Sequence, residues 1–556
     1  MEHKPLPIGI ENFEEMINKE YYYVDKTLFI KELLDKMGKV NLYTRPRRFG
    51  KTLLLSMLKS YFDIEGDAKV FDGLKIMDAG DRYTSHMNKY HVISLTLKSA
   101  KQNSFESAMR MLRTEFVREF DKNAYVLESN KIDDRDKELF IRLKSGKADY
   151  SEYKITLKLL CECIFKATGT KPIILIDEYD VPLQSAYYNG YYDEMIDFMR
   201  SLFEGAFKTN DYLEFAVITG CLRISKESIF TGLNNLKINS ILADNYDEFF
   251  GFTEEEVKEM LSIYNLDVKY AEVKNWYNGY VFGSANVYNP WSSIMYVDDH
   301  VANINRLPVS YWANTSSNSI IKDLIECADD IVKSEIEGLI AGETIEKPVH
   351  EDITYGEIHE SQDNLWNFLF FTGYLKKVSE RFDDDTKNTF LTLKIPNWEV
   401  EYIYREKILS WFQKKVKETD RTRLFNALVN FDAKTFETEM GKLLRQSISF
   451  NDYYENFYHG FLVGILMGMD GYIVKSNREG GQGRSDIFVK PLDMSNPGIV
   501  IEIKVADSMR NIEEKAKEAN AQIIEKGYED ELLCEGFLET RRIGVAFFKK
   551  NCKVCC

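Results

Sequence analysis

The sequence contains little proline and little cysteine for its length. Its 556 residues include 11 prolines, 31 glycines and 8 cysteines, while hydrophobic residues make up 44%. This composition excludes a collagen-like chain and a largely disordered one, and the length predicts roughly three or four domains. The cysteines do not have the spacing of disulfide-rich secreted domains, and MEHKPLPIGIENFEE contains no basic-then-apolar leader. We therefore expect a cytoplasmic protein.

The sequence also lacks an excess of positive charge. Lys and Arg number 72 against 89 Asp and Glu, which gives a formal net charge of −17. This balance argues against a general attraction to nucleic acid or to anionic membranes, so any nucleic-acid site must be local. The longest apolar run, FLVGILMGM, is too short to span a bilayer, and no membrane partner is expected.

Changes in hydrophobic pattern predict an α/β multidomain protein with three regions. Residues 1–240 alternate apolar runs such as VNLYT, HVISLTL and PIILIDEY with helical stretches, which is typical of the parallel sheet of a P-loop NTPase. Residues 241–435 are expected to form a mostly helical lid or linker region, with Thr253 and Glu256 capping one helix. Residues 436–556 return to strands and helices and predict a second α/β domain.

A phosphate-binding loop is predicted where the strand VNLYT meets the helix KTLLLSMLKSYF. Backbone N–H groups at the start of this helix can hold phosphate oxygens, and Arg48 and Gly50 belong to the same loop. Lys51 is expected to neutralise the β- and γ-phosphates of ATP, and the Thr52 hydroxyl to bind Mg²⁺. The alternative is a helix that simply begins after a turn.

The loop departs from the general motif at its first position. The usual glycine, five residues before Gly50, is replaced by Arg45. We therefore expect the chain to enter the loop through a different backbone turn that uses Pro46.

A second nucleotide motif follows in KPIILIDEYDVPL. Asp177 is expected to hold Mg²⁺ and Glu178 to polarise the attacking water, both at the carboxyl end of a buried strand. The alternative is a strand that ends in a solvated acidic turn. Thr219, at the end of EFAVITG, is a candidate sensor of the γ-phosphate. Arg223 and Lys226 are candidates for phosphate contacts, or else solvated bases in a capped turn.

The last region carries a second set of charged residues. Glu502 and Lys504 lie two apart on one predicted strand and share a face, and an adjacent strand can bring Asp486 beside Glu502. Paired carboxylates favour Mg²⁺ or Mn²⁺, and the lysine can orient water or stabilise charge on a scissile phosphate. The alternative is two strands that merely alternate apolar and polar faces.

Other residues in this region give weaker signals. Glu455 and His459 share a helix face but are more simply explained by packing, and Gln522 can bond a phosphate or solvent. Glu479 is an alternative candidate for an additional acidic ligand of the metal ion. We expect the terminal CKVCC to be a frayed, reduced tail.

In combination these motifs resemble known families. The first region resembles the AAA-ATPase-like family of bacterial and archaeal proteins in three segments: RPRRFGKT after YYYVDKT, IILIDEYD, and ITGCLRISKESIFTGLNNL. The segments YHGFLVGILMG, SNREGGQGRSDI, IEIK and VAFFKK resemble the PD-(D/E)xK nuclease superfamily, which implies a restriction-endonuclease-like domain. The resemblance implies nucleotide roles for Lys51, Thr52, Asp177 and Glu178, and a nuclease core of Asp486, Glu502 and Lys504.

The leading hypothesis is an ATP-hydrolysing protein fused to a metal-dependent nuclease. The resemblance implies DNA as substrate and loosely implies defence or mobile-element biology. The intact set of Asp486, Glu502 and Lys504 favours cleavage. The acidic net charge favours the alternative, an ATP-gated signalling or scaffold protein whose nuclease-like domain binds without cleaving. Assembly into a homo-oligomer is left open.

Overall fold

The described residues form two compact units. In the computed structural model they are 3–223, 229–230, 233–312, 330–351, 361–406, 420–446, 455–467, 469–476 and 487–556. The first unit comprises Met1–Thr315 and Thr344–Glu401, and the second comprises Ser316–Glu343 and Tyr402–Cys556. The predicted region 241–435 is therefore divided between the two units. Within the described ranges no helix combines the length and apolar character of a membrane span.

A five-stranded parallel sheet organises the first unit. Its order is β2-β3-β4-β1-β5, built from β1 (Val40–Thr44), β2 (Val92–Thr96), β3 (Ile173–Asp177), β4 (Ala216–Gly220) and β5 (Leu236–Asn239). Every residue of β1, β3 and β4 is buried, which explains why these strands are mostly apolar. The prediction of an α/β fold with a parallel amino-terminal sheet is confirmed.

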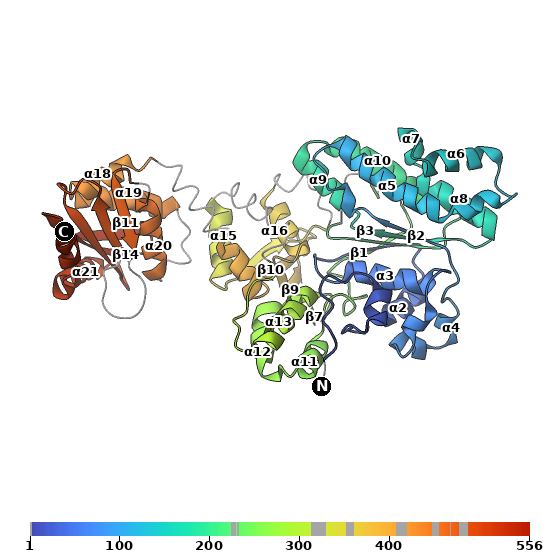
Figure 1. Ribbon diagram of the computed structural model, residues 1–556, viewed down its shortest axis with the longest axis horizontal. Helices are drawn as coiled ribbons and strands as arrows, with labels where there is room; N and C mark the ends of the chain where they lie inside the picture. The colour runs from blue at the N-terminus through green and yellow to red at the C-terminus, as the bar shows by residue number, and fades with distance from the viewer. Residues whose placement is uncertain are drawn as a thin grey trace. The chain divides into compact units, whose positions relative to one another are not determined.

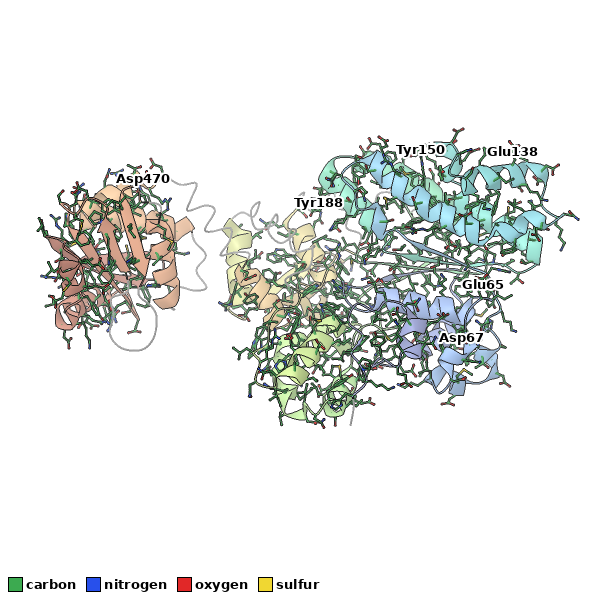
Figure 2. All side chains as sticks on the ribbon, viewed as in Figure 1. Glu65, Asp67, Glu138, Tyr150, Tyr188 and Asp470 are labelled. Carbon is green, nitrogen blue, oxygen red and sulfur yellow. The ribbon has the colours of Figure 1, made fainter. Side chains whose placement is uncertain are left out.

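Helices cover both faces of this sheet. Figure 1 shows α5 (Phe105–Lys122), α8 (Thr156–Thr168) and α10 (Tyr192–Phe207) on one face, and α2 (Leu28–Lys36) and α3 (Lys51–Phe62) on the other. Side chains fill both layers in Figure 2. The shorter helices of this region are α1 (Phe13–Asn18), α4 (Asp81–Thr84), α6 (Asp134–Lys144), α7 (Tyr150–Tyr153) and α9 (Val181–Asn189).

The remainder of the first unit contains helices and two small sheets. The predicted capping box is present: Thr253 and Glu256 exchange hydrogen bonds at the start of α11 (Glu254–Ile263). A hairpin pairs β6 (Tyr280–Phe282) with β7 (Ala285–Val287), and a three-stranded antiparallel sheet has the order β8-β10-β9. The elements are α12 (Tyr270–Tyr277), α13 (Pro290–Ala302), α16 (Gln362–Phe371), β8 (Ile345–Pro348), β9 (Lys376–Phe382) and β10 (Thr389–Lys394).

A mixed five-stranded sheet organises the second unit. Its order is β11-β12-β13-β14-β15, with β13 and β14 parallel and the other pairs antiparallel. The backbone of α21 comes so close to β14 that a Cβ on Gly544 would lie 2.3 Å from Ala516 O. The elements are α15 (Asp330–Ile340), α18 (Thr422–Val429), α19 (Ala433–Gln446), α20 (Glu455–Leu466), β11 (Tyr472–Ser476), β12 (Ile487–Pro491), β13 (Gly498–Val505), α21 (Ile512–Lys526), α22 (Glu529–Cys534), β14 (Thr540–Phe548) and β15 (Asn551–Cys555).

The carboxyl terminus is not frayed, and this expectation was wrong. The CKVCC segment forms most of β15, which pairs with β14. Glu437 of α19 accepts a hydrogen bond from Val554 N at 3.0 Å and pairs with Lys553 at 2.9 Å, while Cys552 is buried. α19 therefore holds this edge strand in place, and the segment is an ordered part of the sheet.

Glu399 is a carboxylate buried in the first unit. It has no exposed surface, and its oxygens accept hydrogen bonds from Ser292 Oγ at 2.9 and 3.0 Å and from Trp312 N at 2.9 Å. Burial outweighs these hydrogen bonds and raises the pKa of Glu399 to about 7. The folded protein therefore binds a proton here that the unfolded chain releases at a lower pH.

We predict that Glu399→Gln stabilises the protein more at pH 8 than at pH 5. Between the ordinary pKa of glutamate and pH 7, the unfolded state binds fewer protons at this position, so wild-type stability falls as pH rises. The stabilisation by Glu399→Gln should therefore be larger at pH 8 than at pH 5 by up to about 3 kcal/mol, because the carboxyl is deeply buried. Calorimetric unfolding of wild type and variant at both pH values measures it. The exposed Glu106→Gln is the control, and an equal Glu399→Gln effect at both pH values would contradict the prediction.

Candidate functional site

Three predicted residues meet at the carboxyl edge of the parallel sheet. β4 lies between β1 and β3, with Tyr43 of β1 opposite Thr219. Asp177 Oδ1 accepts a hydrogen bond from Thr219 Oγ1 at 2.5 Å, and Asp177 Oδ2 accepts one from Thr52 Oγ1 at 2.6 Å. Asp177 and Thr219 are both buried. The strand order therefore brings together residues from two motifs that lie far apart in the sequence.

The loop between β1 and α3 supplies the cationic side of the site. Gly50 adopts a left-handed conformation, with φ of 79°, as the residue immediately before α3. Lys51 is buried, and its Nζ donates to Arg45 O at 2.9 Å and to Pro46 O at 2.8 Å. Exposed Arg48 stacks its guanidinium on Trp291 of α13, 4.5 Å from the ring centroid.

Arg45 explains how the loop begins without the usual glycine. Its Nη1 donates to Thr44 O at 2.9 Å and to Asn239 O of β5 at 2.7 Å. Its guanidinium lies 4.8 Å from the Phe250 ring and 5.2 Å from the Phe282 ring. Complete burial lowers the pKa of Arg45 to about 9, so the group stays charged at neutral pH. Arg45 therefore attaches the start of the loop to the neighbouring strand.

Glu178 lies beside the threonine-bound aspartate. It has a left-handed φ of 54°, a conformation that costs a non-glycine residue about 1 kcal/mol or more. Its carboxyl is half-buried, and burial followed by the charge of Asp177 raises its pKa, while Lys51 opposes the rise. These surroundings are those of a carboxylate that can accept a proton.

The two residues after Glu178 also belong to the site, and sequence reasoning missed them. Tyr179 Oη donates to Leu222 O at 2.6 Å. Asp180 Oδ2 accepts from Cys221 N at 2.8 Å and from Leu222 N at 3.2 Å, and Asp180 is buried. These bonds tie the acidic turn to the turn after β4. The available signal was a third acidic residue in IILIDEYD, close behind a buried strand.

Arg223 extends from the same turn toward another part of the first unit. Its Nη1 lies 3.3 Å from Glu351 Oε2, and Ser240 Oγ donates to Glu351 Oε1 at 3.4 Å. Arg223 thus lies at the edge of the sheet where phosphate contacts were predicted, but its partner in the structure is the Glu351 carboxylate. Lys226 lies outside the described residues.

The donor atoms at this edge fit a nucleotide with a hard divalent cation. A threonine hydroxyl and a carboxylate are oxygen ligands of the kind that Mg²⁺ prefers, and the lysine and the helix start favour phosphate. Within the described ranges no three His, Cys, Asp or Glu side chains gather as metal donors. A cation here would therefore rely on Thr52, Asp177 and oxygen atoms of its ligand.

In the second unit, Glu502 and Lys504 lie on β13 as predicted. Glu502 is 5% exposed and accepts a hydrogen bond from Gln522 Nε2 of α21. Gln522 thus holds the carboxylate in the structure. Lys504 is half-buried, and its two-residue spacing from Glu502 gives both side chains the same face.

The remaining candidates of this unit are only partly described. Asp486 and Glu479 lie outside the described residues, whereas Ile487, which follows Asp486, pairs with Ile501, directly before Glu502. His459 of α20 is buried. The side chain of Glu455 is not described.

Two regions of the chain match models of known protein families. Residues 7–230 match the family model described as predicted AAA-ATPase, and residues 453–556 match the PD-(D/E)XK nuclease superfamily. One relative, named "Uncharacterized protein in vnfD 5'region" from Azotobacter chroococcum mcd 1, is 28% identical over 327 residues. The alignment covers 58% of this chain and 57% of that protein. The resemblance inferred from the motifs is confirmed.

We predict that Gly220→Ala disturbs the site. A Cβ at this position would lie 2.5 Å from Tyr179 Cε1 and 2.9 Å from Asp180 Oδ1, so the acidic turn must shift. We expect a loss of stability of about 1–3 kcal/mol, as for an overpacked core. Urea unfolding measures the loss. The control is Gly205→Ala in α10, where the closest atom outside the helix is 3.7 Å away and alanine favours the helix. Equal stabilities of the two variants would contradict the prediction.

Proposed function

We propose that this chain, which joins a predicted AAA-ATPase region to a PD-(D/E)XK nuclease superfamily domain, hydrolyses ATP and cleaves nucleic acid. The proposed nuclease depends on Mg²⁺ or Mn²⁺ and acts on DNA. A cytoplasmic location and a role in defence or mobile-element biology are parts of the same proposal. The observation that carries it is the hydrogen-bonded group of Thr52, Asp177 and Thr219, which joins the phosphate loop to the acidic strand.

The proposed ATPase roles follow from the charges and contacts of each residue. Lys51 would exchange its carbonyl partners for the β- and γ-phosphates. Thr52 and Asp177 would hold Mg²⁺, which when bound neutralises phosphate charge. Glu178 would orient water and accept its proton. Thr219 would keep the Asp177 carboxylate in place and so link β4 to the γ-phosphate.

The proposed nuclease roles rest on a smaller set of contacts. Asp486 and Glu502 would hold the divalent cation, which when bound lowers the pKa of water and stabilises phosphate charge. Gln522 would fix the orientation of Glu502, because its amide donates to that carboxylate. Lys504 would stabilise the charge that develops on the scissile phosphate.

We predict that Lys51→Ala and Glu178→Gln affect ATP hydrolysis in different ways. Loss of the ammonium should abolish turnover and most tight binding, because it balances phosphate charge. Glu178→Gln should keep binding and lose at least about 100-fold in kcat, a typical contribution of a general base. Isothermal titration with a slowly hydrolysed ATP analogue and a turnover assay separate the effects.

The pH profile provides the control for this assignment. Because the pKa of Glu178 is raised, wild-type kcat should fall on acidification at a higher pH than an ordinary glutamate would give. The residual rate of Glu178→Gln should lack this inflection. Wild-type turnover in either variant would contradict the assignment.

We predict that Asp486, Glu502 and Lys504 contribute differently to cleavage. Asp486→Ala and Glu502→Ala should weaken both Mn²⁺ binding and cleavage, because each removes a proposed ligand. Lys504→Ala should retain Mn²⁺ binding and lose cleavage. Gln522→Ala should weaken both moderately, since Glu502 loses its hydrogen-bond donor.

Cleavage of single-stranded and duplex DNA and RNA at low salt, beside Mn²⁺ titrations, checks these expectations. ATP turnover should stay unchanged in all four variants and serves as a control for folding. Metal-independent cleavage, or full activity of Glu502→Ala, would contradict these nuclease roles. DNA binding by wild type without cleavage would instead favour the ATP-gated signalling or scaffold function.

A further inference from the structure

Two lysines face each other across the small antiparallel sheet of the first unit. Lys376 begins β9 and lies directly opposite Lys394, the last residue of β10. Side chains opposite each other in an antiparallel pair share one face and have Cβ atoms about 5 Å apart. The two ammonium groups therefore belong to one patch of surface.

The charge of this pair is not compensated. Among the described residues neither the Lys376 nor the Lys394 side chain forms a hydrogen bond or an ion pair. Burial and the charge of Lys394 both lower the pKa of Lys376, and no carboxylate opposes them. The adjacent Lys377, by contrast, pairs with Glu380 at 3.0 Å. Like charges directly opposite each other are destabilising, and an anion between them would relieve that cost.

Two tryptophans lie in neighbouring segments of the chain: Trp398 follows Lys394 by four residues, and Trp276 precedes Gly279 by three. The rings of Trp276, in α12, and Trp398 are nearly perpendicular, with centroids 6.2 Å apart, and Trp398 is 51% exposed. Asn397 Nδ2 donates to Asn278 O at 2.7 Å, which joins the two tryptophan segments.

Lys376 approaches these joined segments. Lys376 Nζ lies 3.1 Å from the position that a Cβ on Gly279 would take, next to Asn278. We call Lys376, Lys394, Trp276 and Trp398 the Lys–Trp patch. It combines uncompensated positive charge with an exposed aromatic face.

We propose that the Lys–Trp patch binds single-stranded nucleic acid, with backbone phosphates on Lys376 and Lys394 and a base stacked on Trp398. Cationic side chains next to exposed aromatic rings are the combination that binds single strands without sequence preference. In a chain of net charge −17, contact with nucleic acid has to use such a local cationic surface. An acidic peptide would satisfy the lysines but supplies no base to stack on the indole.

This inference goes beyond the proposed function. None of the four residues belongs to the candidate nucleotide or nuclease residues, so binding at the patch does not require either site to be catalytic. The two ideas can therefore fail separately: cleavage tests the nuclease, whereas binding in the presence of EDTA tests the patch.

Fluorescence anisotropy of a labelled 12-nucleotide single strand with the full chain, at low salt and with EDTA, tests the proposal. Trp398→Ala should weaken binding about tenfold, the effect expected from loss of one stacked base. Trp398→Phe should recover most of that loss. The double variant Lys376→Gln/Lys394→Gln should weaken binding. It should also reduce the magnitude of the slope of log affinity against log salt concentration by about 1.4, which corresponds to the loss of two phosphate contacts.

Lys377→Gln is the matched control, because it removes a lysine that already has a carboxylate partner. It should change affinity less than twofold, and circular dichroism should show all variants folded. Three results would overturn the proposal: no binding by wild type, equal binding by wild type and the patch variants, or tighter binding of duplex than of single strand. Displacement of the strand by an equal concentration of polyglutamate would assign the patch to an acidic protein and would also overturn it.

Discussion

The Asp177 carboxylate accepts a hydrogen bond from Thr52 on one oxygen and from Thr219 on the other, and the second contact comes from β4, which lies between β1 and β3. Parallel strands place all their carboxyl ends at one edge, so the order of the strands decides which side chains meet there. With β4 between its neighbours, the phosphate loop, the acidic turn and the turn after β4 form one connected group. The tight contacts at Gly220 and the bonds from Tyr179 and Asp180 preserve this arrangement.

Arg45 shows how the loop accommodates a residue that the general motif excludes. Its side chain turns into the protein, where backbone carbonyls and two aromatic rings surround the charge. Its backbone N also donates to Gly220 O at 3.0 Å, so one residue contacts both strands that flank β1. The aromatic partners Phe250 and Phe282 lie beyond β5 in the sequence. The loop therefore depends on the segments after the sheet as well as on the sheet itself.

Sequence reasoning found residues that meet at the edge of the first sheet because strand ends and helix starts fix where such residues lie. VNLYT, IILID and EFAVITG are mostly apolar, which is typical of strands in a sheet covered on both faces. Lys51, Thr52, Asp177 and Thr219 follow from that pattern. Tyr179 and Asp180 did not, because their partners are backbone atoms of a turn about 40 residues away, which no spacing rule reveals.

In the second unit too, contacts between elements far apart in the sequence could not be predicted. The strand with Glu502 and Lys504 was predictable from its alternation, whereas the bond from Gln522 depends on how α21 lies across β13 and β14. The terminal CKVCC looked unstructured because a short strand with charged and sulfur-containing residues carries little pattern. Its order comes from β14 and from Glu437 of α19, which are tertiary contacts.

We propose that the hydroxyl of Thr219 holds Asp177 in position for ATP hydrolysis. The most direct test is Mg²⁺-dependent ATP turnover by Thr219→Val and Thr219→Ser, with binding of an ATP analogue measured in parallel. Valine preserves the shape but cannot donate the hydrogen bond, so kcat should fall about tenfold or more while analogue binding changes little; removing one partner of a buried charged hydrogen bond costs about 1–3 kcal/mol. Serine should retain most of the activity. Wild-type turnover in Thr219→Val would contradict this role of Thr219.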